Sequence, residues 1–318
     1  MTAEGRPAVW TTAAQARDAL RGHDVWALVP TMGDLHEGHL DLVRAAAAVG
    51  PVVVSVFVNP TQFAPGEDYD RYPRRLESDV ERLAALGVVG VFAPEVEEMY
   101  PPGESTRVDA GAVARPLCGS HREGHFEGVA TVCTKLFAAL RPPVAAFGEK
   151  DAQQCIVLHR LVTDLRFAVD LLFVPTRRED DGLAMSSRNR YLEGDERVTA
   201  RALSEGLRRG RELLAGGERD VSAIESAVAG HLRAAGVAPD YAELRQVPSL
   251  AHEDTVGGRV LLAVAGRVGR ARLIDNHCFD VDATTVRPAS LFDEHTPEAV
   301  AARWAEGDGA PRSTEGKT

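Results

Sequence analysis

Short apolar runs alternate with stretches of helical spacing through the first 175 residues, and this alternation limits the possible folds most strongly. The runs are too short for helices and rich in β-branched residues, which is typical of buried strands. They lie at 25–29, 52–58, 88–92, 144–147 and 168–174. The helical stretches lie at 39–48, 76–86, 127–141 and 151–164. Strands that alternate with helices form βαβ units, so we predict an α/β fold with a doubly wound, mostly parallel sheet.

The pattern changes after about residue 190. Two polar amphipathic helices are expected at 195–216 and 220–235, followed by strands at 260–265 and 271–275. We therefore divide the chain into a first domain at 1–176 and a smaller α+β domain at 177–287. Residues 288–318 are rich in Pro, Gly, Ser, Thr and charge with little periodicity, which indicates a mostly disordered tail. Within it, 297–305 could form one short helix.

Composition narrows the class of protein. The chain has 318 residues, with 36 Lys and Arg against 47 Asp and Glu, and the net charge of −11 argues against nucleic-acid partners. The longest mostly apolar stretch, 45–58, is interrupted by Gly50 and Pro51 and is shorter than the about 20 residues of a membrane span. The N-terminus lacks the apolar core of a signal peptide, and four cysteines without CxxC spacing indicate reduced thiols. These features predict a cytoplasmic enzyme without membrane or nucleic-acid partners.

The segment 30–39 carries the first chemical signal, directly after an expected strand and at the start of an expected helix. His36 and His39 are three residues apart, so they face the same way at the helix start. The free N–H groups of a helix N-terminus bind anions, and two imidazoles beside them suit a nucleotide triphosphate. Taken alone, such a pair is more often a helix cap and a packed or solvated histidine. It could also be half of a metal site, but no convincing further ligands lie nearby in the sequence.

Three more polar segments follow expected strands. Asn59 and Gln62 offer amides to a hydroxy acid, and Lys150 places a positive charge near a helix start. The 181–190 loop offers two serine hydroxyls and Arg188. Each segment alone also fits an ordinary turn or a solvated surface. Because the carboxyl ends of parallel strands meet at one sheet edge, we expect the segments to converge there.

Taken together, these strings resemble the pantothenate synthetase (pantoate–β-alanine ligase) family of the HxGH nucleotidyltransferase superfamily. The resemblance extends from about residue 8 to about 280 and rests on PTMGDLHEGH (30–39), VFVNPTQF (56–63), GHFEGVATVCTKLF (124–137), FGEKDAQQ (147–154), DGLAMSSRNRYL (181–192) and ARLIDN (271–276). It implies a Rossmann-like first domain, a smaller C-terminal lid domain and a homodimer. It also implies two steps: pantoate and ATP give pantoyl adenylate and pyrophosphate, and β-alanine then releases pantothenate and AMP.

The resemblance also implies roles for individual residues. It assigns catalysis to His36, His39 (the acid) and Lys150. ATP binding falls on Met32, Gly33, Asp34, Leu35, His36, Glu37, Gly38, His39, Gly148, Glu149, Lys150, Asp151, Arg177, Met185, Ser186, Ser187 and Arg188. Gln62 and Gln154 would hold pantoate, and Gln62 would also contact β-alanine. Mg²⁺ would arrive with ATP, held by phosphate oxygens and water without direct protein ligands, with Asp79 as a weak candidate for indirect support.

Some positions depart from the family pattern, and some alternatives stay open. Arg177, Glu123 and Glu127 stand where the family more often has an apolar residue, a proline and, in some members, an arginine. His121 and His125 are four apart, a spacing that can bind zinc, although Gly124 lies between them. The alternative functions are another HxGH nucleotidyltransferase, such as a cytidylyltransferase, and a nucleotide-binding regulator without turnover.

Overall fold

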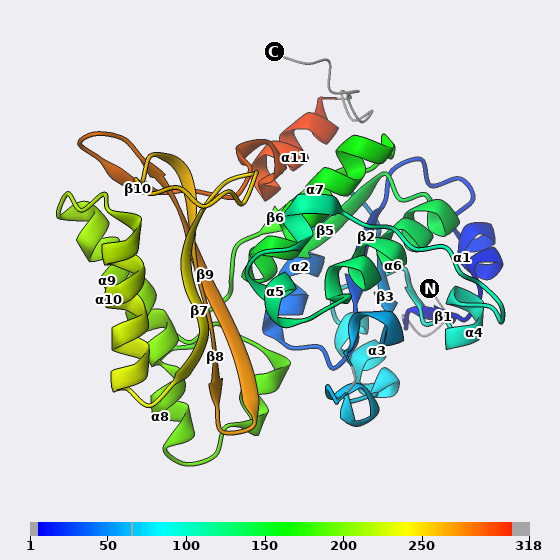
Figure 1. Cartoon of the computed structure of the whole chain (residues 1–318). Coiled ribbons are helices and arrows are strands. Elements are labelled where there is room, and N and C mark those ends of the chain that lie inside the picture. The colour runs from blue at the N-terminus through cyan, green and yellow to red at the C-terminus, as the bar shows by residue number, and fades with distance from the viewer. Residues whose placement is uncertain (1–5, 65, 307–318) are drawn as a thin grey trace.

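The first half of the chain forms a six-stranded parallel sheet, as predicted (Figure 1). The computed structural model describes residues 6–64 and 66–306. The strand order is β1-β4-β3-β2-β5-β6. The strands are β1 (Ala8–Trp10), β2 (Ala27–Thr31), β3 (Val52–Val56), β4 (Gly90–Phe92), β5 (Val144–Gly148) and β6 (Asp170–Val174).

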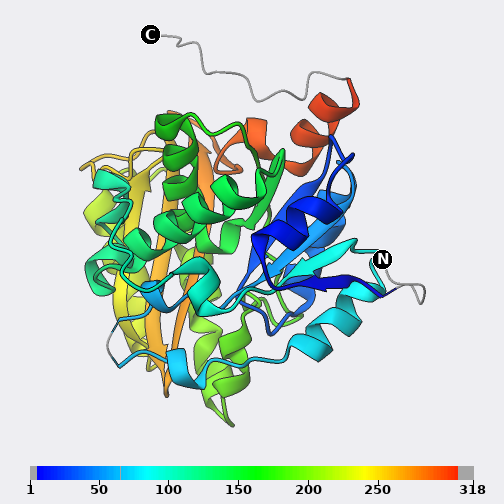
Figure 2. The ribbon, with the colours of Figure 1, turned by 90° about the vertical axis from the view of Figure 1, so that its right-hand side faces the viewer.

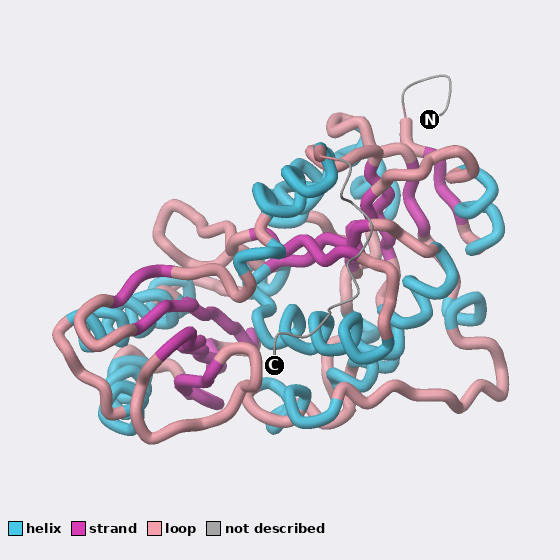
Figure 3. Tube along the Cα trace, turned by 90° about the horizontal axis from the view of Figure 1, so that it is seen from above, coloured by secondary structure: helices cyan, strands magenta, loops and turns pink. Residues whose placement is uncertain are grey.

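Helices cover both faces of this sheet, as Figure 3 shows from above. On one face, α1, α6 and α7 pack against strand residues such as Leu28, Val53 and Phe173. On the other face, α2, α3 and α11 pack against the alternate strand residues, including Val29 and Val54. The helices are α1 (Ala13–Ala19), α2 (Glu37–Ala47), α3 (Leu76–Ala84), α4 (Val96–Met99), α5 (Cys118–His121), α6 (His125–Leu140), α7 (Ala152–Leu165) and α11 (Pro297–Ala305).

The direction of chain progression reverses at β2, which pairs with β3 on one side and β5 on the other. Ligands bind to doubly wound sheets at such a switch point, outside the carboxyl ends of the strands. The segments that follow β2 and β5 are 32–36 and 149–151, and the fold therefore brings the two histidines and Lys150 to one crevice.

The second half forms an antiparallel sheet in the order β10-β9-β8-β7, which stands beside the first sheet in Figure 1. One face packs against helices through residues such as Leu262 and Val264, and the other meets the first half through Tyr241 and Leu261. Its elements are α8 (Glu196–Ala200), α9 (Ala202–Ala215), α10 (Val221–Ala234), β7 (Ala238–Gln246), β8 (Gly258–Val268), β9 (Ala271–Val281) and β10 (Val286–Pro288).

The structure differs from the sequence prediction at 288–306, where mostly disordered chain was expected. The segment continues from β10 through a 3₁₀ turn at Asp293–His295 into α11, the one helix anticipated there. It packs along edge strand β6, as Figures 1 and 2 show at the upper end of the molecule, and Val300 is fully buried. Arg303 donates to both carboxylate oxygens of Asp170 at 2.7–3.0 Å. Residues 288–306 have little hydrophobic periodicity of their own, and their packing against the edge strand β6 gives them a fixed structure. Residues 307–318 lie outside the described residues.

None of the helices within 6–64 and 66–306 is both long and apolar enough to cross a bilayer. In the same part of the chain the four cysteines are free thiols, of which Cys118, Cys133 and Cys155 are buried. Burial raises the pKa of Cys133 to about 12, so this thiol stays protonated at neutral pH.

Gly128 allows α6 to approach the turn that follows β3. A Cβ at this position would lie 2.4 Å from the Thr61 carbonyl oxygen and 2.7 Å from the Gln62 nitrogen, which are rigid main-chain atoms. We expect Gly128→Ala to lower the free energy of unfolding by about 1–3 kcal/mol, as measured by urea denaturation. The matched control is Gly230→Ala in α10, where a Cβ meets nothing within 4 Å, and it should raise stability by up to about 1 kcal/mol. Equal stabilities of the two variants would contradict the packing argument.

Candidate active site

The turn between β2 and α2 is held by one buried carboxylate. Asp79 of α3 accepts the main-chain N–H groups of Asp34 at 2.9 Å and Leu35 at 2.8 Å. The turn needs this support because Gly33 and Asp34 have φ values of 81° and 53°, in the left-handed region. A Cβ on Gly33 would also lie 2.9 Å from Val56. Asp79 therefore positions the turn that leads into His36.

His36 and His39 lie against each other at the start of α2. Their ring centroids are 4.0 Å apart, and the His36 main-chain N–H donates to Nδ1 of His39 at 3.2 Å. Because Nδ1 accepts, the neutral ring carries its proton on Nε2 and can donate from there. Burial, followed by the charge of Lys150, lowers the pKa of His36 to about 4. Burial, followed by His36 and Lys150, lowers the pKa of His39 to about 3. Both imidazoles are thus neutral at pH 7.

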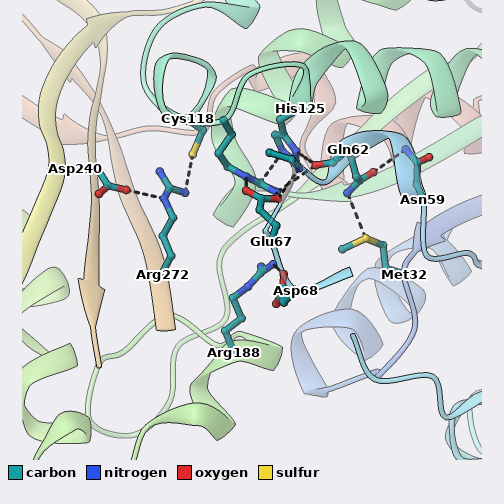
Figure 4. A network of polar contacts seen from close by, with 12 residues as sticks. Met32, Asn59, Gln62, Glu67, Asp68, Cys118, His125, Arg188, Asp240 and Arg272 are labelled. Carbon is teal, nitrogen blue, oxygen red and sulfur yellow. Dashed lines mark hydrogen bonds and ion pairs between the residues drawn. The ribbon is translucent and has the colours of Figure 1, made fainter. Parts of the chain in front are cut away.

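Amide groups fix the turn after β3 (Figure 4). Asn59 donates from Nδ2 to Oε1 of Gln62 at 3.1 Å and to the Gly128 carbonyl at 3.1 Å. Its Oδ1 accepts from the Tyr100 hydroxyl at 2.8 Å. These bonds direct Nε2 of Gln62 toward Met32 Sδ, 3.2 Å away. The Gln62 amide therefore borders the same space as the histidine turn, with a set orientation.

The structure also reveals a support for Gln62 that the sequence analysis did not assign. His125 Nδ1 donates to the Gln62 carbonyl at 2.8 Å, and Arg122 donates to it at 3.3 Å while pairing with Glu67 at 2.7 Å (Figure 4). His125 Nε2 lies 3.0 Å from the Arg122 guanidinium, so both of its ring nitrogens are engaged and the zinc alternative with His121 finds no support here. The only sequence signal for this group was the family string that begins at Gly124.

Lys150 is placed by the end of β5 and by the second sheet. Asn276 of β9 donates from Nδ2 to the carbonyls of Glu149 at 3.0 Å and Lys150 at 2.9 Å. The ammonium group lies 3.6 Å from Asp151 Oδ1 and is only partly exposed. Its charge acts on both histidines, as their lowered pKa values show.

The 181–192 loop closes over the start of α2. Ser186 Oγ accepts the main-chain N–H of Arg188 at 3.2 Å and caps the short 3₁₀ helix Ser187–Tyr191. Arg188 pairs with Asp68 at 3.1 Å, and Arg190 pairs with Asp34 at 2.5 Å. Ser186, Ser187 and Arg188 line the same cavity as the two histidines.

Two adjoining cavities result. The one in the crevice has about 210 Å³, and a second of about 360 Å³ lies between the two sheets. They share Lys150, Asp151, Gln154, Ser186 and Arg188. The crevice cavity is lined by most of the predicted site residues: Met32, His36, Gly38, His39, Gln62, Gly148, Lys150, Asp151, Gln154, Arg177, Met185, Ser186, Ser187 and Arg188.

The remaining predicted ATP residues line neither cavity. Gly33, Asp34 and Leu35 form the turn after β2, Glu37 begins α2, and Glu149 follows β5. Glu149 accepts the Leu291 N–H at 2.9 Å. Of the departures from the family pattern, Arg177 turns its side chain to Asp41 at 2.8 Å, and Glu123 and Glu127 are exposed and line neither cavity.

A helix N-terminus and a lysine that meet at one switch-point crevice are characteristic of a nucleotide-binding α/β enzyme. The chain matches the family model described as pantoate-beta-alanine ligase over residues 8–278. It is 49% identical over 257 residues to the pantothenate synthetase of Carboxydothermus hydrogenoformans. The aligned region covers 80% of this chain and 91% of that protein.

Two solved structures agree. The pantothenate synthetase of Thermus thermophilus superimposes with a TM-score of 0.81 at 46% identity and covers 85% of this chain and 98% of that one. The pantoate-beta-alanine ligase of Francisella tularensis, solved with beta-gamma ATP and beta-alanine, gives a TM-score of 0.71 at 32% identity, with 85% and 97% covered. The chain belongs to the pantoate–β-alanine ligase family. It is an enzyme that joins pantoate to β-alanine to give pantothenate.

Burial of neutral histidines makes the fold sensitive to acid. The pKa of His39 is near 6.5 in the unfolded chain and about 3 in the folded protein. Below pH 6.5 the unfolded chain therefore binds more protons, and the free energy of unfolding decreases as the pH is lowered. We expect His39→Asn to reduce this slope between pH 6 and 4 by about 1.4 kcal/mol per pH unit, measured by urea denaturation. His23→Asn, at an exposed position, should leave the slope unchanged. Identical slopes in the two variants would exclude a buried neutral His39.

Proposed function

We propose that pantoate, ATP and β-alanine react in the crevice cavity through an enzyme-bound pantoyl adenylate. One observation carries this proposal: the histidine pair, Lys150 and the Gln62 amide border the same space. The Francisella relative was solved with beta-gamma ATP and beta-alanine, which supports binding of both substrates here. The cytidylyltransferase alternative is not favoured, because the relatives are pantothenate synthetases.

In this proposal the phosphates of ATP lie between α2 and the 186–188 loop. His39 donates from Nε2, and His36 and the N-terminus of α2 add further donors. Lys150 and Arg188 neutralise charge, Ser186 and Ser187 offer hydroxyls, and Gly148 and Asp151 hold the ribose. As the α-phosphate passes to pantoate, negative charge grows on the departing pyrophosphate. Donors that are already oriented stabilise this charge by about 3 kcal/mol each. A neutral His39 does so as a hydrogen-bond donor and takes up acid character only as the phosphates raise its pKa.

Pantoate would be held by the Gln62 and Gln154 amides. Its carboxylate oxygen attacks the α-phosphorus, a P–O bond forms, and pyrophosphate leaves. The acyl carbon of the mixed anhydride is then attacked by the amine of β-alanine near Gln62. AMP leaves, and the amine gives up a proton. Catalysis therefore depends on positioning and charge stabilisation, and the protein forms no covalent intermediate.

Further assignments complete the proposal. Mg²⁺ would come with ATP on phosphate oxygens and water, and Asp79 would act only through the turn, because its two oxygens accept main-chain N–H groups. Residues 1–176 would form the nucleotide- and pantoate-binding domain, and 177–287 would form a lid. We also infer a homodimer, which light scattering would test, and a cytoplasmic location.

Isotope exchange between ATP and pyrophosphate tests the route. We expect exchange that requires pantoate and Mg²⁺ but not β-alanine, and transfer of ¹⁸O from the pantoate carboxylate to AMP. Exchange that requires β-alanine, or ¹⁸O that stays out of AMP, would exclude a free-standing adenylate step. ATP binding without any turnover would favour the regulator.

Removal of one phosphate donor should slow the first step. We expect His39→Ala and Lys150→Ala to lower kcat for pantoate-dependent exchange by about 10²–10³-fold, since each loses a preorganised donor. His23→Ala, an exposed histidine, is the matched control and should retain activity. Circular dichroism would confirm folding of all three. Full activity of folded His39→Ala would remove its role.

A further inference from the structure

Three potential metal ligands converge on the side of the first half, in a cluster that lines neither cavity. His159 lies in α7, and Glu294 and His295 lie in the 3₁₀ turn before α11. One donor atom from each residue can be chosen so that all three lie within 4.8 Å of one another. The cluster joins the body of the sheet to the C-terminal segment.

Most of these donor atoms are not committed to other partners. Among the described residues, the His159 ring and the Glu294 carboxylate have no hydrogen-bond or ion-pair partner, and Nδ1 of His295 is buried without a hydrogen bond. The His295 ring also faces the main chain of Leu171 and the carboxylate of Asp170. The His159 ring and the Glu294 carboxylate are therefore available to a bound cation.

The two rings are held in place by aromatic packing. His159 stacks on Phe292 with ring centroids 4.1 Å apart and an interplanar angle of 16°. His295 meets Phe173 edge-on at 5.3 Å and His159 at 5.4 Å. Rings fixed before binding lose little side-chain entropy when they accept a metal. The Glu294 side chain is exposed and can adjust toward a Zn–O distance of about 2.0–2.2 Å.

The surroundings also favour the ligand form of His295. Its Nδ1 lies 3.8 Å from Oδ1 of Asp170, which is held by Arg303 and by Trp304 Nε1. Metal-bound histidines commonly turn one nitrogen toward a carboxylate, and the other nitrogen then ligates the metal. Burial lowers the pKa of His159 to about 4 and also lowers that of His295, so both rings are neutral as ligation requires.

We propose that His159, Glu294 and His295 form a site for a borderline-soft divalent metal ion, with Zn²⁺ as the best fit. Two imidazole nitrogens and one carboxylate oxygen suit Zn²⁺ with water as the fourth ligand, whereas Mg²⁺ prefers oxygen ligands alone. The ion would fasten the C-terminal segment to α7. This site is independent of the Mg²⁺ that accompanies ATP.

Titration of the full-length, untagged protein with ZnCl₂ by isothermal calorimetry tests the proposal. We expect one Zn²⁺ per chain at this site and a rise in Tm of about 5 °C at saturating Zn²⁺, with no such rise from Mg²⁺. His159→Phe and His295→Phe keep an aromatic ring in place and should each weaken binding at least 100-fold. Glu294→Gln, at an exposed position, should weaken it about 10-fold without disturbing the fold.

Control variants separate this site from other histidines. The double variant His36→Ala/His39→Ala and the single variant His252→Ala, which removes an exposed histidine paired with Glu225, should bind Zn²⁺ at the cluster like wild type. Co²⁺ should give a tetrahedral absorption spectrum that His295→Phe abolishes. Pantoate-dependent exchange with Mg²⁺ should persist in the cluster variants. Absence of Zn²⁺ binding in wild type, or unchanged binding in folded Glu294→Gln and His295→Phe, would overturn the proposal.

Discussion

The pairing of β2 with both β3 and β5 is the constraint on which the rest of the molecule depends. It makes the neighbours of β2 diverge, so the turns after β2 and β5 face each other across an open edge. His39 and Lys150 are more than a hundred residues apart in sequence, yet the charge of Lys150 contributes to the lowered pKa of His39. Helices pack on both faces of the sheet and fix the positions of these strands, so the sheet itself positions the crevice.

Burial of polar groups in the crevice costs free energy, because they lose hydrogen bonds to water. Hydrogen bonds to buried side chains offset this cost. Asp79 satisfies two main-chain N–H groups of the histidine turn, and Asn59 uses both ends of its amide around Gln62. An unpaired buried polar group would cost about 1–3 kcal/mol. Asp79 lines neither cavity, whereas Asn59 borders the crevice with its amide already bonded to Gln62, Gly128 and Tyr100. Both residues orient the groups beside them, so the site geometry depends on their hydrogen bonds.

Periodicity was sufficient to predict the strands around the site, since β2, β3, β5 and β6 are buried and nearly uniformly apolar. It failed for β7, where Asp240, Glu243 and Arg245 break the apolar pattern because alternate side chains leave the core. It anticipated the short helix at 297–305 but not that 288–306 is ordered by contacts with a distant edge strand. The Arg122–Glu67 pair joins residues 55 positions apart and has no local signal. Local sequence patterns therefore predicted which residues lie at the site, whereas contacts between distant parts of the chain orient those residues.

The loop that carries Lys150 connects the crevice to the rest of the chain. Asn276 of β9 holds its carbonyls, and the carboxylate of Glu149 accepts the Leu291 N–H from the segment that leads into α11. Both contacts come from the second half of the sequence, so the position of the Lys150 loop depends on how that half packs. If ATP binds as proposed, a chain with a net charge of −11 meets this polyanion through a few cations, and each has to be well placed. Anchoring the Lys150 loop from two sides, one of them the C-terminal segment, provides that placement.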